Sequence, residues 1–353
     1  SVAALSGSAS TARGLLGGGD TFPYTGSAVI TGSLGVTGSV SFAKVTLPSA
    51  GVWSTGGVLT TERKEGAGAG TQTAGLAFGG RNNSYSHIST TEEYDGAAWS
   101  AGGVLPLPRH HLAGTGTQTA ALAFGGVSFS PTVYYDVTNE YDGTNWSTGG
   151  VLSQAKLYLA GAGTQNAGLA FGGRDSSFTL APCTEEYNGA SWSTAGAGPL
   201  STPRSDLAGT GTQNAALAFG GPYLYPSIST CTEEYNGATW SSGGNLSQGR
   251  EHLAGAGTQT AGLAFGGKPG YSTYSSHTEE YDGTNWSTGG ALLTARACLG
   301  GAGTQNAGLA FGGNNLYCSP QTFTSTEEYT KVVGGITKTF DYSESTGDTT
   351  ATG

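Results

Sequence analysis

The sequence predicts an all-β protein in which six four-stranded repeats close into a ring. Three observations lead to this prediction. A self-similar unit recurs six times at a spacing of 46 to 48 residues, each unit carries turn signals between short apolar runs, and one tryptophan lies ahead of the first unit. A period of this length is typical of repeat architectures, which bury their cores by packing one unit on the next.

The repeat is clearest between Gly161 and Trp192, where GAGTQNAGLAFGG, ten variable residues and TEEYNGASW follow one another. Glycine makes up 63 of the 353 residues, far above the average of about 7%. These glycines stand at fixed places in every copy, so they indicate ordered turns and close contacts rather than disorder. The glutamine of the repeat recurs as Gln72, Gln118, Gln165, Gln213, Gln259 and Gln305, and the tyrosine as Tyr94, Tyr141, Tyr187, Tyr235, Tyr281 and Tyr329.

Each repeat is expected to form four strands. In the second copy these cover residues 109–116, residues 120–124, residues 138–141 and a fourth strand that carries Trp146. The first strand is made of small residues, as expected where six sheets crowd around an axis. An Asp-Gly or Asn-Gly turn joins the third and fourth strands in five copies, and this is a strong hairpin signal.

The tryptophans are offset from the other repeat positions. The sixth copy ends at Tyr329 without a tryptophan, whereas Trp53 precedes the first copy. We therefore expect the segment around Trp53 to supply the outer strand of the last repeat, which closes the ring and removes exposed sheet edges. A linear solenoid would cap its ends instead.

An arginine, small residues, an apolar run, Gly-Gly, Tyr and then Trp, repeated at close to 50 residues, resemble the kelch repeat. This resemblance covers residues 48–330 and implies a six-bladed β-propeller of the superfamily that includes galactose oxidase. The WD class differs in its shorter repeat and in its Gly-His and Trp-Asp signatures.

The two ends of the chain, residues 1–47 and 331–353, do not follow the repeat pattern. Residues 24–41 read as three hexads, YTGSAV, ITGSLG and VTGSVS, which place Ile30, Val36 and Phe42 on one face of an extended strand. Such hexads resemble connector segments of phage fibre proteins, so residues 1–47 are expected to be an assembly arm, with homo-oligomerisation through residues 24–42. A flexible Gly/Ser linker is the alternative. Residues 331–353 are expected to hold one more strand, over residues 336–342, and a polar tail.

Composition excludes several functions. Only 14 lysines and arginines offset 24 acidic residues, for a net charge of −10, so no nucleic acid partner is expected. No apolar stretch approaches the roughly 20 residues that span a membrane. The cysteines Cys183, Cys231, Cys298 and Cys318 do not form a disulfide-scaffold pattern, and free thiols are expected.

The loops between the second and third strands vary strongly, whereas the other turns barely change. We expect these loops to share one face with the connections between repeats, and this variation over a constant scaffold favours recognition. Each loop carries aromatics among Ser, Asn, Thr and Pro, a composition that paratopes use. In the alternative, the rings fold back and cover the blades. The predicted rim residues are Tyr85, Phe129, Tyr134, Tyr135, Phe178, Tyr223, Tyr225, Tyr271, Tyr274, Tyr317 and Phe323.

Charged residues also recur. Adjacent glutamates such as Glu92 and Glu93 lie on a strand and must point to opposite faces, so they do not form a catalytic pair. One basic residue per repeat is expected to make a structural contact with a glutamate. The basic residues are Arg63, Arg109, Lys156, Arg204, Arg250 and Arg296.

Histidines suggest no metal site. His111 and His252 hold the same position in the second and fifth repeats, on opposite sides of the ring, so we expect them to be too far apart to share an ion. The resemblance to galactose oxidase would imply converging tyrosine and histidine copper ligands, and these do not map onto this chain. No catalytic residue and no cofactor are predicted.

These patterns together predict a non-enzymatic structural or recognition protein on a virion (a tail fibre or appendage) or another extracellular assembly. It would bind other protein subunits and a host-surface glycan or protein through the aromatic loops. The alternative is a purely architectural subunit that has no ligand of its own. A galactose-oxidase-like enzyme is the third and least favoured hypothesis.

Overall fold

The computed structural model describes residues 3–5, 28–30, 50–129, 131–224, 227–315 and 322–331. They belong to two units, residues 1–47 with 335–353, and residues 48–334. In the first unit β1 (Ala3–Leu5) pairs in parallel with β2 (Ala28–Ile30). Strand β2 falls within the predicted hexad strand. The remainder of residues 24–42, and the strand predicted over residues 336–342, lie outside the described residues.

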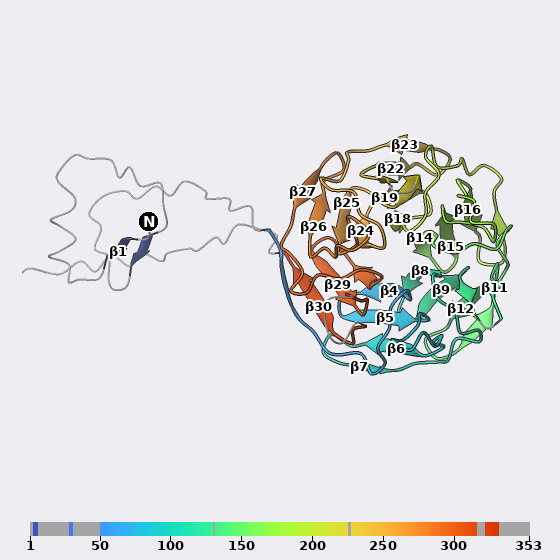
Figure 1. Ribbon diagram of the computed structural model, residues 1–353, viewed down its shortest axis with the longest axis horizontal. Coiled ribbons are helices and arrows are strands. Elements are labelled where there is room, and N and C mark those ends of the chain that lie inside the picture. Colours follow the sequence, from blue (N-terminus) through green and yellow to red (C-terminus); the bar gives the residue numbers. More distant parts are fainter. Residues whose placement is uncertain are drawn as a thin grey trace, which may run out of the picture. The chain divides into compact units, whose positions relative to one another are not determined.

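The second unit is a six-bladed β-propeller of four-stranded antiparallel sheets, as predicted (Figure 1). The strands of each blade follow one another from the axis outward. Blades one to three are β4 (Ala67–Thr71), β5 (Ala74–Phe78), β6 (Thr91–Tyr94) and β7 (Trp99–Ala101); β8 (Ala113–Thr117), β9 (Ala120–Phe124), β12 (Thr138–Tyr141) and β13 (Trp146–Thr148); and β14 (Ala160–Thr164), β15 (Ala167–Phe171), β16 (Thr184–Tyr187) and β17 (Trp192–Ser193).

Blades four to six follow the same pattern. They are β18 (Ala208–Thr212), β19 (Ala215–Phe219), β22 (Thr232–Tyr235) and β23 (Trp240–Ser242); β24 (Ala254–Thr258), β25 (Ala261–Phe265), β26 (Thr278–Tyr281) and β27 (Trp286–Thr288); and β28 (Gly300–Gly303), β29 (Ala307–Phe311), β30 (Thr326–Thr330) and β3 (Val52–Thr55). No helix in the part of the chain that the structure describes has the length and apolar character needed to cross a membrane.

The ring closes as the displaced tryptophan predicts. Strand β3 pairs antiparallel with β30, and Trp53 stands opposite Tyr329 in this register. In Figure 1 the blue N-terminal strand accordingly runs along the outside of the red C-terminal blade. The last sheet is therefore built from both ends of the propeller, and its outer edge is the edge of β3 rather than that of β30.

The innermost strand is shorter than predicted. In the second blade β8 begins at Ala113, so the expected start at Arg109 is wrong. His111 has a φ of 54°, a left-handed conformation that a strand cannot contain. The small residues that follow are needed for packing, because a Cβ atom added to Gly114 would lie 2.4 Å from Cζ of Phe78.

Three constant residues of each repeat join neighbouring blades. Trp146 Nε1 donates a hydrogen bond to Thr91 Oγ1 at 2.8 Å, and Tyr141 Oη donates to Glu93 Oε1 at 2.5 Å. Gln118 Nε2 donates to the carbonyl oxygen of Tyr94 at 2.7 Å.

Equivalent bonds recur at the closing junction between the first and sixth blades. There Trp99 donates to Thr326, and Gln72 donates to the carbonyl oxygen of Tyr329. The invariance of Trp, Tyr and Gln thus follows from their contacts across blades.

The basic residue before each inner strand is buried within its own blade, as the predicted structural contact requires. Arg204 Nη2 lies 2.8 Å from Glu233 Oε1, and Lys156 Nζ lies 2.6 Å from Glu185 Oε1. The second blade departs from the pattern, because its third strand carries Asn139 in place of the glutamate. There Arg109 Nη1 donates to Asn139 Oδ1 at 3.0 Å.

Candidate functional site

One face of the propeller carries both the variable loops and the connections between blades. In the first blade Lys64, in the connection, forms an antiparallel bridge with Arg81 of the loop between strands two and three. Arg81 Nη2 also donates to Glu65 Oε1 at 2.8 Å. This face has two distinct features: the aromatic rim on the loops, and a ring of six residues around the axis.

The aromatic rim consists of exposed rings on the loops between strands two and three. Five predicted rim residues are exposed, led by Tyr271 at 81% and Tyr85 at 61%. Within the described residues, every exposed aromatic side chain belongs to this rim. Its members are Tyr85, Phe129, Phe178, Tyr223 and Tyr271.

Local turns present these rings to solvent. Tyr85 and Phe178 both have a φ of 60°, and each stands at the tip of a short turn. In the third blade Asp175 Oδ1 accepts hydrogen bonds from the backbone N–H groups of Ser177 and Thr179, at 2.8 and 2.9 Å. In the second and fourth blades the loops instead form small hairpins, β10 (Val127–Ser128) with β11 (Val133–Tyr134) and β20 (Pro222–Leu224) with β21 (Ser227–Ile228).

Not every predicted rim residue is exposed. Phe323 is buried, and its ring centroid lies 4.9 Å from Cζ of Arg296, so it does not belong to the rim. Tyr135 is half-buried with its ring 6.0 Å from Cζ of Arg109. Both rings cover the buried basic residue of their blade, as the alternative interpretation of the loops expected. Tyr134 and Tyr274 are half-buried, whereas Tyr225 and Tyr317 lie outside the described residues.

The second feature is an axial ring of six residues at equivalent repeat positions. Each has a left-handed φ between 54° and 60°, a conformation that costs an L-residue about 1 kcal/mol. Each backbone N–H donates to the carbonyl oxygen of the preceding member at 2.8 to 3.0 Å, so six hydrogen bonds form a closed cycle around the axis. The members are Glu65, His111, Tyr158, Asp206, His252 and Cys298.

The side chains of the axial ring converge on a cavity of about 100 Å³ at one mouth of the central channel. The ring centroids of His111 and His252 are 6.3 Å apart, so the two residues lie closer together than their positions on opposite blades led us to expect. They come from opposite blades, but their repeat position lies beside the axis, where all six blades meet. This radial position agrees with the prediction that the first strand of each repeat lies nearest the axis.

The two histidines of the axial ring stand in different electrostatic surroundings. Burial lowers the pKa of His252, but the adjacent Cys298 sulfur and Asp206 carboxylate outweigh this and raise the pKa above its ordinary value. His252 Nδ1 lies 3.1 Å from Asp206 Oδ1. On the other side, burial together with the charges of His252 and Arg81 holds the pKa of His111 well below 6.5. The pKa values of the two histidines are therefore shifted in opposite directions.

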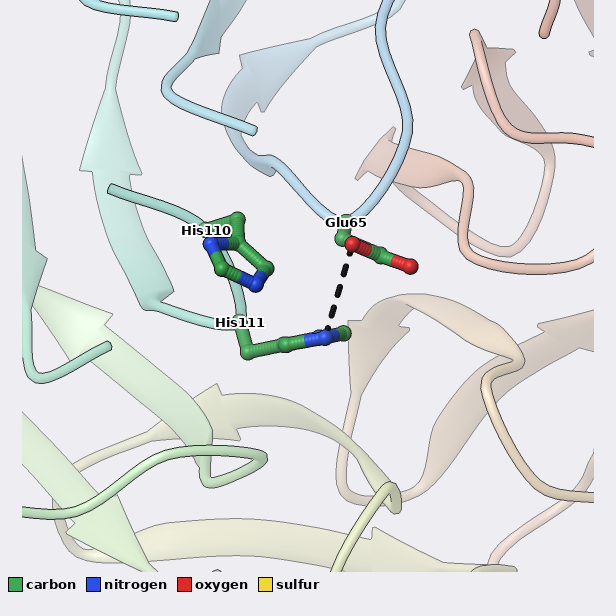
Figure 2. Close-up of side chains that lie close together, drawn as sticks. All are labelled: Glu65, His110 and His111. Carbon is green, nitrogen blue, oxygen red and sulfur yellow. Dashed lines mark ion pairs between the residues drawn. The ribbon is translucent and has the colours of Figure 1, made fainter. Parts of the chain in front are cut away.

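A third histidine lies beside Glu65 and His111 of the axial ring. His110 is fully buried, and burial together with the charge of His111 lowers its pKa to about 3. Figure 2 shows Glu65, His110 and His111 side by side, with one ring nitrogen of His110 facing the space beside the His111–Glu65 contact. One ligand atom from each residue lies within 4.8 Å of the other two.

The sequence pattern alone does not predict this cluster. The His-His pair at residues 110–111 is a visible signal, since the other repeats carry Lys64, Leu157, Ser205, Glu251 and Ala297 at the first of the two positions. Its partner Glu65 stands one full repeat earlier, and only the axial ring brings the three together. Imidazole nitrogens and a carboxylate oxygen can exchange protons or bind a divalent cation.

No family model matches the sequence, and no curated protein is significantly similar to it.

Proposed function

We propose that the protein is a kelch-type propeller of a virion appendage or another extracellular assembly, and that it recognises a host-surface glycan or protein without catalysing a reaction. The observation that carries this proposal is the position of the exposed aromatic rings. Every one in the described part of the chain stands on the variable loops of one face. Exposed rings gathered on one face of a protein are characteristic of binding surfaces.

The chemistry of the rim favours a glycan. Tyrosine offers a large flat surface and a hydroxyl group at a small cost in conformational entropy, and neighbouring Ser and Asn residues supply adaptable hydrogen bonds. The C–H faces of sugar rings pack on such surfaces. Lys268 Nζ lies 5.8 Å from the ring centroid of Tyr271, and this cation would add an attraction for sugars that carry a carboxylate.

The separation of constant blade-joining residues from variable loops within each repeat supports the same proposal. The residues that join the blades are constant, and they lie on the strands and on the turn between strands one and two. The loops between strands two and three supply none of the Trp, Tyr and Gln contacts between blades, so their sequences can change without loss of the ring. This is how a scaffold that presents different binding surfaces is expected to be built.

Tyr223 and Tyr271 provide the test, since they stand on adjacent blades and are 45% and 81% exposed. Replacing both with alanine in the full chain should weaken binding to host cells and to a glycan panel by at least about 30-fold, as loss of a hot-spot aromatic costs about 2 kcal/mol or more. The matched control replaces Val104 and Val151, which are 63% and 54% exposed outside these loops. That control should bind normally.

The melting temperature should be the same for both double variants and the unchanged protein. Equal binding by the folded tyrosine variant would remove these two rings from the proposed surface. If the unchanged protein binds no glycan and no cell surface, the architectural alternative is favoured, in which the rim packs against other subunits.

A further inference from the structure

We propose that Glu65, His110 and His111 form a binding site for a borderline divalent cation, with Zn²⁺ as the best match, at the mouth of the central channel. This site is separate from the aromatic rim and does not depend on what the rim binds. The three residues offer two imidazole nitrogens and one carboxylate oxygen. That combination is preferred by Zn²⁺ and by neighbouring transition metals, whereas Mg²⁺ and Ca²⁺ prefer oxygen ligands.

The spacing of the ligand atoms is close to what a zinc ion requires. Bonds of about 2.0 to 2.2 Å in a tetrahedral arrangement place ligand atoms roughly 3.4 Å apart. His111 Nε2 already lies 3.4 Å from Glu65 Oε2. All three ligand atoms lie within 4.8 Å of one another, so metal binding requires His110 to approach the other two by at most about 1.4 Å.

The unusual backbone explains how two consecutive histidines face one point. In an extended chain, adjacent side chains point to opposite faces. His110 forms a bridge to Val127 as a strand residue would, but His111 has a φ of 54°, so the chain turns there. The axial ring of hydrogen bonds fixes this turn, since His111 N–H donates to the carbonyl oxygen of Glu65 at 2.8 Å.

His110 is the strongest indication that something binds here. Its side chain is fully buried, yet neither ring nitrogen has a hydrogen-bond partner within the described residues. A buried polar group without a partner is costly, and native proteins seldom leave one unexplained. His87 stacks on one face of His110 with ring centroids 4.9 Å apart, and Phe129 packs against it at the same distance. A metal ion would give one of these nitrogens a partner.

Arg81 is compatible with the site as a second-sphere group. Its Nη2 atom donates to Glu65 Oε1, and its Nε atom contacts Glu65 Oε2, the oxygen that also faces His111. The arginine thus holds both carboxylate oxygens and orients the group, while a remaining lone pair on Oε2 can bind the ion. Glu65 and His111 also line the axial cavity, which leaves room for a water or a small anion as a further ligand.

The test is titration of the full, metal-free chain with Zn²⁺ alone, followed by calorimetry. We expect one ion per chain and a higher melting temperature when the ion is bound. His110→Leu and His111→Asn should each weaken binding by at least about 100-fold, because loss of even an outer-sphere partner costs about 10- to 100-fold. An excess of Mg²⁺ should not compete.

The repeats themselves supply fold-compatible variants and controls. Leucine stands at the His110 position in the third blade, where Leu157 is buried, and asparagine tolerates a left-handed φ. His277→Thr removes a histidine elsewhere on the protein, where the first blade carries Thr90, and Cys298→Ser removes the thiol of the axial ring. Both should bind Zn²⁺ as the unchanged protein does.

A second measurement needs no variant: the absorption spectrum of the Co²⁺-loaded chain should show nitrogen and oxygen ligands without thiolate. The proposal is overturned if the unchanged chain binds no Zn²⁺, if folded His110→Leu binds it normally, or if Cys298→Ser alone abolishes binding with a thiolate-rich Co²⁺ spectrum.

Discussion

At the scale of single residues, the buried basic residue before each inner strand shows how one substitution changes the electrostatic environment inside a blade. Burial lowers the pKa of Arg250, while the charge and hydrogen bond of Glu279 oppose the shift. In the second blade burial lowers the pKa of Arg109 to about 10, and Asn139 supplies a neutral oxygen in place of a carboxylate. Among the six buried basic residues, Arg109 is thus the one that has no carboxylate partner in its own blade.

Exchanging these partners should change stability in opposite directions. Asn139→Glu gives Arg109 the carboxylate of the other blades and should stabilise the propeller, whereas Glu233→Asn leaves Arg204 without one and should destabilise it. A hydrogen bond to a charged group contributes about 1.5–3 kcal/mol, which sets the expected size of each change. Unfolding in urea measures both. A lower midpoint for Asn139→Glu than for the unchanged protein would contradict this explanation of Arg109.

At the scale of an element, the turn between strands three and four depends on its first side chain. Asp95 Oδ1 accepts hydrogen bonds from the backbone N–H groups of Ala97 and Ala98, at 2.8 and 2.7 Å. Asn188 makes the same two bonds in the third blade, at 3.0 and 2.9 Å. The turn then needs Gly96, with a φ of 93°, as expected for a tight hairpin. A carboxylate and an amide therefore serve equally in this element.

Aspartate and asparagine should nevertheless differ in acid. Backbone hydrogen bonds lower the pKa values of Asp95, Asp142 and Asp282 below the ordinary 3.8. A lowered folded-state pKa contributes stability above the ordinary value and loses it as the pH falls through the folded-state value. The triple variant with asparagine at all three positions should match the unchanged protein at pH 7 and lose less stability near pH 3. Melting temperatures at the two pH values measure this, and parallel losses in both proteins would contradict it.

At the scale of the whole molecule, closure of the ring depends on one short strand. Trp53 of β3 donates from Nε1 to Thr278 Oγ1 at 2.9 Å, and its ring lies 5.0 Å from those of Phe265 and Tyr329. These are the contacts that Trp146 makes within the continuous part of the chain, where its ring lies 5.0 Å from Phe78. The closing blade therefore uses the same junction as the other five.

Point variants of the tryptophans and a deletion of the closing strand should have different effects, because the point variants remove only packing whereas the deletion also opens the ring. Trp53→Ala and Trp146→Ala should each cost roughly 3–5 kcal/mol, as expected for a large buried aromatic. Deleting residues 48–57 should also expose the edge of β30, so that the protein aggregates. Unfolding measurements on the two point variants and light scattering on the deletion variant provide the test. A monomeric deletion variant with an unchanged melting temperature would show that β3 does not close the ring.

Much of this fold could be predicted from the sequence because its signals are local or periodic. The strands predicted over residues 120–124 and 138–141 have the observed bounds of β9 and β12. Asp-Gly and Asn-Gly pairs mark the outer hairpins, and the displaced Trp53 indicates the partner of β30. The predicted inner strand is too long, since a left-handed histidine leaves no mark in the sequence.

The candidate site also has a part that the sequence predicts and a part that only the tertiary structure shows. The sequence by itself determined which loops vary and that they carry aromatic rings, because composition and repeat alignment are properties of the chain. Only the tertiary structure decided that Phe323 turns inward over Arg296 while Tyr271 stays exposed. It alone decided that Glu65, His110 and His111 meet. The reason is geometric: repeat number and strand order give the approximate place of a residue around the axis, but which side chains meet there depends on the left-handed turn at each position and on how the six blades close.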